Sequence, residues 1–135
     1  MKNVTRRQIY FWGSIWNLAF ALSGLVMPKF TMYLLLGTTE AITGVPARTF
    51  FAFFWMFVGV FGLGYYIVSR NPDRNEAVIY TGCLAKVVIS VTVWLLYFSQ
   101  QVTIFGLLGG LGDLIWTVIF LAARRGEKVK AIVLR

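Results

Sequence analysis

The sequence predicts an all-α integral membrane protein, a four-helix bundle with up-down-up-down topology. Of its 135 residues, 59% are hydrophobic and 13% charged, whereas a soluble domain is about 45–50% apolar and about 25% charged. The apolar residues gather in four runs, each long enough to cross a hydrocarbon core of about 30 Å at about 1.5 Å per residue. The short connections between the later runs make consecutive helices antiparallel neighbours. We therefore expect one transmembrane domain, residues 1–135.

The first expected span is 9–27, which follows a polar, basic start and ends before Pro28. A basic start and an apolar run also describe a signal peptide, and Ala19-Phe20-Ala21 imitates a cleavage site. The run stays apolar well past Ala21 and holds Asn17 near its middle. These features favour a membrane span over a signal peptide.

The longest connection contains an apolar segment that is too short to span. Its core, 30–36, has seven largely apolar residues, which suits an interfacial or re-entrant turn of helix. We expect such a segment at about 30–44, and the sequence leaves open whether it lies on the membrane or re-enters it. Glu40 falls within this segment.

The second expected span, 49–69, opens with aromatic residues typical of an interfacial belt. Gly59, Gly62 and Gly64 then make one side of the helix thin, and small residues let membrane helices approach closely. We expect these glycines to leave room beside a polar layer. Pro72 forbids helix continuation and sets a tight turn to the next span.

The third and fourth expected spans, 77–98 and 103–123, form a hairpin in which each run carries one charge near its middle. Lys86 lies twelve residues before the first run ends, and Asp113 lies ten residues into the second, so both are roughly 15–18 Å below the same surface. A lone charge at mid-membrane costs roughly 2.5–3.5 kcal/mol. Pairing Lys86 with Asp113 reduces this cost.

Asn17 lies at the same depth, so Asn17, Lys86 and Asp113 can meet in one buried polar layer. Ionisable residues inside a membrane are candidates for a functional site, although such a pair can also serve only to fix helix register. Aromatic and small side chains near this layer could line a pocket. The possible lining residues are Trp16, Tyr65, Tyr66, Cys83 and Trp116.

The chain has one cysteine, Cys83, and no histidine. This composition excludes histidine-ligated haem or metal, a Cys-x-x-Cys redox pair, a thiolate zinc cluster and an intrachain disulfide. It also excludes a Ser-His or Cys-His nucleophile. We therefore expect no cofactor and no metal site, and the sequence assigns no catalytic residue.

The net charge of +8 comes mainly from basic residues at the ends of the membrane spans. This distribution is the topology signal of a membrane protein and does not indicate nucleic-acid binding. Ten basic residues fall on the side that holds both termini and the second-to-third loop, and two fall on the other. This imbalance places both termini in the cytoplasm. The ten are Lys2, Arg6, Arg7, Arg70, Arg74, Arg124, Arg125, Lys128, Lys130 and Arg135, and the two are Lys29 and Arg48.

The chain contains four short motifs: Gly64-Tyr65-Tyr66, Pro72-Asp73-Arg74, Gly82 with Lys86, and Gly112-Asp113. In these motifs it resembles a group of small bacterial four-helix membrane proteins, and that group is similar to the broader DoxX-like class. The likeness covers the second to fourth spans, and span two lacks a clear counterpart of the acidic residue often found there in the class. The resemblance implies a four-helix fold in a bacterial inner membrane and implies no particular activity.

Three functions are open from the sequence. The first is an accessory or scaffold subunit that packs against a larger membrane complex or another copy of itself. The second is a midplane site, built on Lys86 and Asp113, for a quinone, a lipid or another amphiphile, or for proton handling. The third is a membrane enzyme that uses Asp113 or Glu40 as an acid or base. All three place the chain in a lipid bilayer, and none involves nucleic acid.

Overall fold

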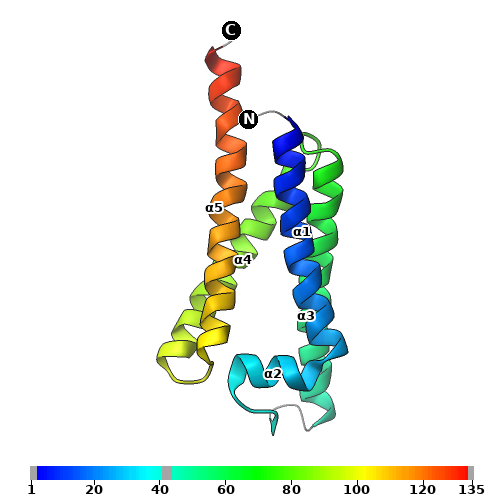
Figure 1. Cartoon of the computed structure of the whole chain (residues 1–135), viewed down its shortest axis with the longest axis vertical. Helices are drawn as coiled ribbons and strands as arrows, with labels where there is room; N and C mark the ends of the chain where they lie inside the picture. The colour runs from blue at the N-terminus through cyan, green and yellow to red at the C-terminus, as the bar shows by residue number, and fades with distance from the viewer. Residues whose placement is uncertain (1–2, 41–43, 134–135) are drawn as a thin grey trace.

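The described part of the chain is all-α, as predicted, with four long helices and one short one (Figure 1). The computed structural model describes the backbone of residues 3–40 and 44–133 and the side chains of residues 6–40 and 44–125. The helices are α1 (Asn3–Val26), α2 (Pro28–Leu36), α3 (Val45–Arg70), α4 (Glu76–Phe98) and α5 (Ile104–Val133).

The four long helices are apolar and long enough to cross a membrane, which makes the chain a multi-pass membrane protein. Each covers all or nearly all of one expected span, and α1, α3 and α5 extend beyond the expected limits. Helix α1 begins at Asn3 rather than at residue 9. Helix α3 begins at Val45 rather than at residue 49, because Pro46 in the first turn needs no helical N–H bond. Helix α5 continues past residue 123 to Val133.

The short helix α2 contains the apolar core, residues 30–36, of the segment expected to be interfacial or re-entrant. It lies across the ends of α1 and α3 rather than along them (Figure 1). It ends at Gly37, whose φ of 74° is the left-handed conformation that glycine adopts without strain. Residues 41–43, the last part of the expected segment, lie outside the described residues.

The long helices form two pairs, α1 with α3 and α4 with α5 (Figure 1). The glycines of α3 bring the first pair together instead of leaving room. A Cβ at Gly62 would lie 3.2 Å from the Cβ of Asn17, and one at Gly59 would lie 3.4 Å from the Cβ of Ala21. The expectation of space beside these glycines is therefore wrong, because α1 fills it.

The two pairs meet in an aromatic core at the end of the bundle that carries the α3–α4 turn. Phe120 of α5 packs edge-on against Tyr65 of α3 and Tyr10 of α1, at ring-centroid distances of 5.0 and 5.3 Å. Gly13 allows this approach, since a Cβ there would lie 2.3 Å from the Phe120 ring. Ile79 of α4 completes the same buried cluster.

Ion pairs hold this end closed. Arg6 of α1 donates to Asp73 in the α3–α4 turn at 2.6 Å, and Arg124 of α5 pairs with Glu76 at the start of α4. Away from this end the two helix pairs diverge (Figure 1).

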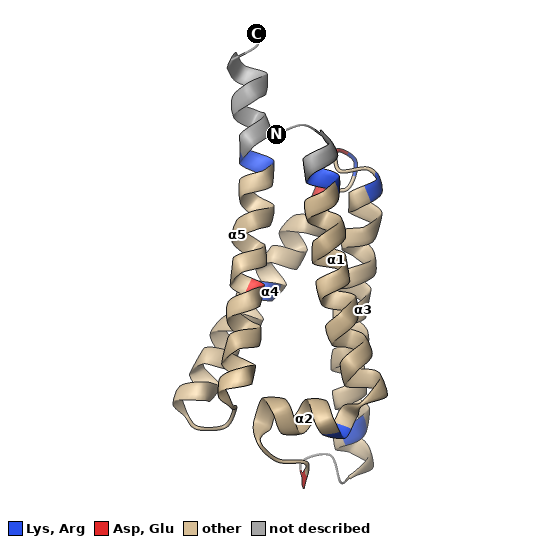
Figure 2. Ribbon diagram, viewed as in Figure 1, with Lys and Arg blue, Asp and Glu red and all other residues tan. Residues whose placement is uncertain are grey.

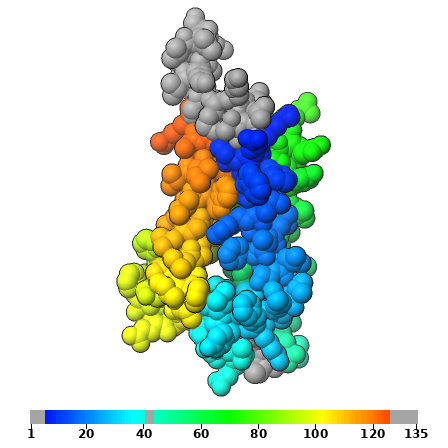
Figure 3. All heavy atoms as spheres, viewed as in Figure 1, coloured from blue at the N-terminus to red at the C-terminus, as the bar shows by residue number. Residues whose placement is uncertain are grey.

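At the wide end, α2 bridges the two pairs. The N–H of Thr103 donates to the carbonyl oxygen of Leu35 at 2.8 Å, and the Thr103 hydroxyl donates to that of Leu34. The surface is hollowed where the start of α5 faces α2 and the adjoining part of α1 (Figure 3). The bundle is therefore a wedge that is closed at one end and bridged by α2 at the other.

Candidate functional site

A polar layer made by three side chains crosses the middle of the bundle. The ammonium of Lys86 on α4 donates to the carboxylate of Asp113 on α5 and, at 2.8 Å, to the Oδ1 of Asn17 on α1. Figure 2 shows the positions of Lys86 and Asp113 midway along the bundle, while the other charged residues that it colours lie toward its two ends. The structure thus brings together the three residues that the sequence placed at one depth.

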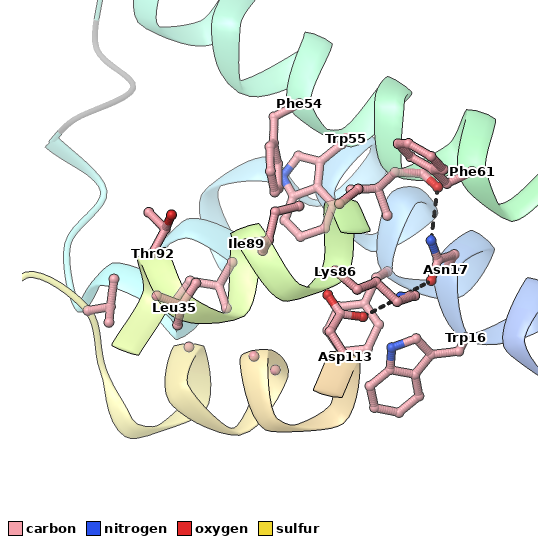
Figure 4. Close-up of a pocket in the computed structure, with 18 of the residues that line it drawn as sticks. Trp16, Asn17, Leu35, Phe54, Trp55, Phe61, Lys86, Ile89, Thr92 and Asp113 are labelled. Atoms are coloured by element: carbon pink, nitrogen blue, oxygen red, sulfur yellow. Dashed lines mark hydrogen bonds and ion pairs between the residues drawn. The ribbon is translucent and has the colours of Figure 1, made fainter. Parts of the chain in front are cut away.

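The amide of Asn17 links the charged pair to the remaining long helix. Its Nδ2 donates to the carbonyl oxygen of Val58 on α3 at 3.4 Å, which leaves Oδ1 facing the ammonium (Figure 4). The layer is therefore neutral overall and touches all four long helices. Because Lys86 and Asn17 are both buried, the two contacts compensate much of the cost of taking the ammonium out of water.

Ser90 anchors the α4–α5 pair one turn from Lys86. Its hydroxyl lies 2.7 Å from the carbonyl oxygen of Lys86 and 2.8 Å from that of Gly110 on α5. A Cβ at Gly110 would lie 3.6 Å from the Cα of Ser90, so the two backbones are in ordinary van der Waals reach at this crossing. Ser90 follows Lys86 by four residues, which puts both on one helical face, but nothing in the sequence pointed to a bond between helices.

One wall of a cavity of about 340 Å³ is formed by this polar layer. Ligand cavities are commonly about 300–1,000 Å³. The remaining wall is almost entirely apolar and comes from all five helices (Figure 4). Besides Asn17, Lys86 and Asp113, the wall includes Trp16, Phe20, Leu35, Phe54, Trp55, Val58, Phe61, Tyr65, Ala85, Ile89, Thr92, Val93, Gly106 and Gly109.

The residues expected to wall a pocket divide into two groups. Trp16 and Tyr65 line the cavity. Tyr66 is 41% exposed on the outer side of α3, Cys83 belongs to the aromatic core, and Trp116 packs against that core at Phe120. These last three residues lie off the cavity wall.

Most of the cavity-lining residues on α3 and α4 were not among the pocket residues expected from the sequence. The α3 wall consists of Trp55 together with Phe54, Val58, Phe61 and Tyr65, and the spacing of three or four places the last four on one helical face. The periodicity was present in the sequence, but the aromatic start of this helix was assigned to a lipid-facing belt. The angle between the two helix pairs, which turns this face inward, is not encoded in any local pattern.

Two donors on the cavity wall lack an acceptor among the described residues. They are the hydroxyl of Tyr65 and the indole N–H of Trp55, both buried. A buried polar group without a partner costs about 1–3 kcal/mol. Both atoms are closed off by their neighbours, so they add a cost to the fold and are not open to the cavity.

The wall also contains open space at one backbone position. A Cβ at Gly109 would meet nothing within 4 Å, whereas one at Gly112 would lie 2.6 Å from the indole of Trp16. Gly112 thus serves close packing, and Gly109 borders the cavity itself. Glu40, the other acidic candidate, is exposed after the end of α2 and does not line the cavity.

The polar layer and the cavity can be interpreted only from their own geometry. No protein-family model, curated protein or solved structure matches this chain.

Proposed function

We propose that this small multi-pass protein binds a membrane-dissolved amphiphile, such as a quinone or a lipid, in the cavity at mid-membrane. The observation that carries the proposal is the position of the Lys86–Asp113 pair on the wall of an otherwise apolar cavity. Apolar walls with a few convergent polar groups are the usual composition of small-molecule sites.

The partial exposure and incomplete hydrogen bonding of Asp113 support ligand binding over a purely structural role. One carboxylate oxygen is engaged by Lys86, while the side chain keeps 20% of its surface exposed. A pair that served only to fix helix register would be most stable with both partners fully surrounded by hydrogen bonds. The free carboxylate oxygen instead gives the cavity an acceptor that a ligand or a transferred proton can use.

The proposal places the protein in a bacterial cytoplasmic membrane with both termini in the cytoplasm. The support is the excess of basic residues at the end that holds the α3–α4 turn, together with the resemblance to the DoxX-like class. In this orientation α2 lies near the outer surface.

The binding test uses the full chain in phosphatidylcholine nanodiscs with two tritiated probes, decylubiquinone and dodecanol. We expect saturable binding of at least one probe above the level of empty discs. Gly109→Leu should weaken that binding about tenfold or more, since leucine would occupy the cavity, and tenfold corresponds to about 1.4 kcal/mol. Leu108→Phe, on the exposed face of the same turn, should leave binding unchanged.

Binding that stays proportional to probe concentration for both probes would contradict the proposal, as would binding insensitive to Gly109→Leu. The variant must show the elution profile and thermal unfolding midpoint of the wild type. This control separates an occupied cavity from a misfolded bundle.

An accessory subunit is the second proposal, and the outer face of α3 favours it. Phe50, Phe53 and Phe57 are all exposed there, and aromatic residues are enriched where proteins pack together. In this case the protein should co-purify from a mild detergent with a stable partner, and Phe53→Ala with Phe57→Ala should release the partner. A homogeneous monomer that binds the probes would instead favour the cavity.

A further inference from the structure

The polar end of the cavity offers one donor and one acceptor side by side. An ammonium group has three hydrogens, and the contacts of Lys86 with Asn17 and Asp113 use two of them. The second oxygen of Asp113 accepts no hydrogen bond from the described residues and is turned away from Lys86, toward the side of Ile89 (Figure 4). A head group that both donates and accepts would satisfy Lys86 and Asp113 together.

The charge of the cavity selects a neutral head group. Lys86 and Asp113 are the only charged side chains on the described wall, and they cancel. A cationic or anionic head would therefore bring an uncompensated charge into a low-dielectric site, which is costly. Hydroxyl and amide groups meet both requirements, since each donates and accepts without charge.

The size of the cavity limits how much of the ligand it holds. An engineered apolar cavity of about 150 Å³ holds one benzene molecule, and this cavity is about 340 Å³. It can take a head group and the first part of an alkyl chain. A longer chain must leave the cavity, so the position of an opening decides what kind of ligand fits.

Two wall residues place an opening between α3 and α4. Phe54 of α3 and Thr92 of α4 line the cavity, yet Phe54 is 43% exposed and Thr92 is exposed as well. Phe54 is nine residues from the start of α3 and Thr92 six from the end of α4, so both lie about 9–14 Å from the helix ends. This is the depth of acyl chains rather than of water.

Helix α2 closes part of the opposite side. The bonds from Thr103 to Leu34 and Leu35 hold it against α5, so the start of α5 is bridged to α1 through α2. Residues of α2 also line the cavity. The α3–α4 side has no corresponding bridge among the described residues (Figure 1).

We infer that the ligand is a neutral single-chain amphiphile with a hydroxyl or amide head group. The head binds the second oxygen of Asp113 and the third N–H of Lys86, whose ammonium also lies 5.8 Å from the centre of the Tyr65 ring. The chain passes between α3 and α4, beside Phe54 and Thr92, into the bilayer. Fatty alcohols, fatty amides and monoacylglycerols have this chemistry. The inference rests on the proposed binding function and specifies its ligand class.

The head-group test compares four tritiated probes of one chain length in phosphatidylcholine nanodiscs at neutral pH: dodecanol, dodecylamine, dodecanoate and dodecane. We expect dodecanol to bind about tenfold more tightly than each of the others. Lys86→Leu with Asp113→Leu should abolish the advantage of dodecanol over dodecane while dodecane still binds. Equal or tighter binding of the amine or the carboxylate would overturn the neutral head group but leave the proposed binding function standing.

The route of the chain is tested at two matched threonines of α4. Thr92 and Thr81 are both exposed, and each hydroxyl donates to a carbonyl of its own helix four residues earlier. Only Thr92 lines the cavity. Thr92→Trp should weaken dodecanol binding about tenfold, whereas Thr81→Trp should not change it. Equal effects of the two substitutions would overturn the route, and failure of every probe to saturate would overturn the proposed function itself.

Discussion

The hydroxyl oxygen of Tyr65 lies 2.1 Å from the point where a Cβ would stand at Gly82. Helix α4 therefore passes over the edge of the tyrosine ring with its backbone, not with a side chain. The same ring packs edge-on against Phe120 at 5.0 Å and is fully buried. Tyr65 thus joins α3, α4 and α5 at the closed end of the wedge, and it also forms part of the cavity wall.

Gly82→Ala should destabilise the bundle. The new Cβ would overlap a fully buried ring that packs against Phe120, and such overpacking costs about 1–3 kcal/mol. Gly109→Ala is the matched control, because its Cβ would meet nothing within 4 Å. The effect of each substitution is measured as the change in the free energy of unfolding in mixed detergent micelles. Equal stability of the two variants would mean that the ring does not occupy this place.

Tyr65→Phe should leave stability unchanged or raise it. The hydroxyl has no partner among the described residues, so its removal also removes a desolvation cost of about 1–3 kcal/mol. The thermal unfolding midpoint in lipid-free detergent is the measurement. A clear loss of stability would show that water or a bound molecule accepts a hydrogen bond from this hydroxyl.

The sequence predicted the helices and the polar layer because both depend on local patterns. Run length and charge fix the number of spans, and counting residues from the loops sets the depths of Asn17, Lys86 and Asp113. Buried charges have few favourable arrangements in lipid, so equal depth on adjacent helices was enough to predict a pair.

The cavity could not be predicted in the same way, because it depends on the angle between the two helix pairs. That angle results from contacts far apart in sequence, such as Phe120 with Gly13 at one end and Thr103 with Leu35 at the other. Glycine patterns were ambiguous for the same reason. Gly62 proved to serve close packing, while Gly109 borders open space, and no local sequence feature distinguishes them.

Thr103→Ala should loosen α2 from the bundle. The substitution removes the bond from the hydroxyl to the carbonyl of Leu34 and the weak cap at the N–H of Gly106, and loss of a helix cap alone costs about 1 kcal/mol. Hydrogen exchange of the α2 amides should accelerate in Thr103→Ala and stay near wild type in Thr103→Ser. Unchanged exchange in both would show that the backbone bond to Leu35 is sufficient.

The proposed topology predicts which loop a membrane-impermeant thiol reagent reaches from outside the cell. Cys83 is buried, so Cys83→Ser provides a background for single cysteines at the exposed Asn71 and Gln101. In intact cells the reagent should label Gln101→Cys and leave Asn71→Cys unlabelled until the cells are opened. The reverse pattern would invert the orientation inferred from the basic residues.

Lys86→Leu and Asp113→Leu should each destabilise the protein more than the two together. Either single change leaves the other charge buried beside an apolar cavity, and breaking a buried pair costs about 3–5 kcal/mol. Replacing both partners with apolar residues is often neutral. We expect low membrane yield for each single variant and recovery in the double variant, measured by expression and by unfolding. Two well-behaved single variants would show that the charges are not paired at depth.

The double-leucine variant, once it folds, distinguishes a structural role of Lys86 and Asp113 from a role in ligand binding. Its helices keep the Ser90 contacts with the carbonyls of residue 86 and Gly110, because both acceptors belong to the backbone. The α4–α5 crossing should therefore survive. Asn17→Leu is the companion variant, since it removes the amide that orients the ammonium while leaving the ion pair in place. At matched membrane levels we expect both variants to fold, the double variant to bind dodecanol no more tightly than dodecane, and Asn17→Leu to bind dodecanol more weakly than the wild type. Full binding by both would mean that the polar layer only sets helix register, which would favour the accessory subunit.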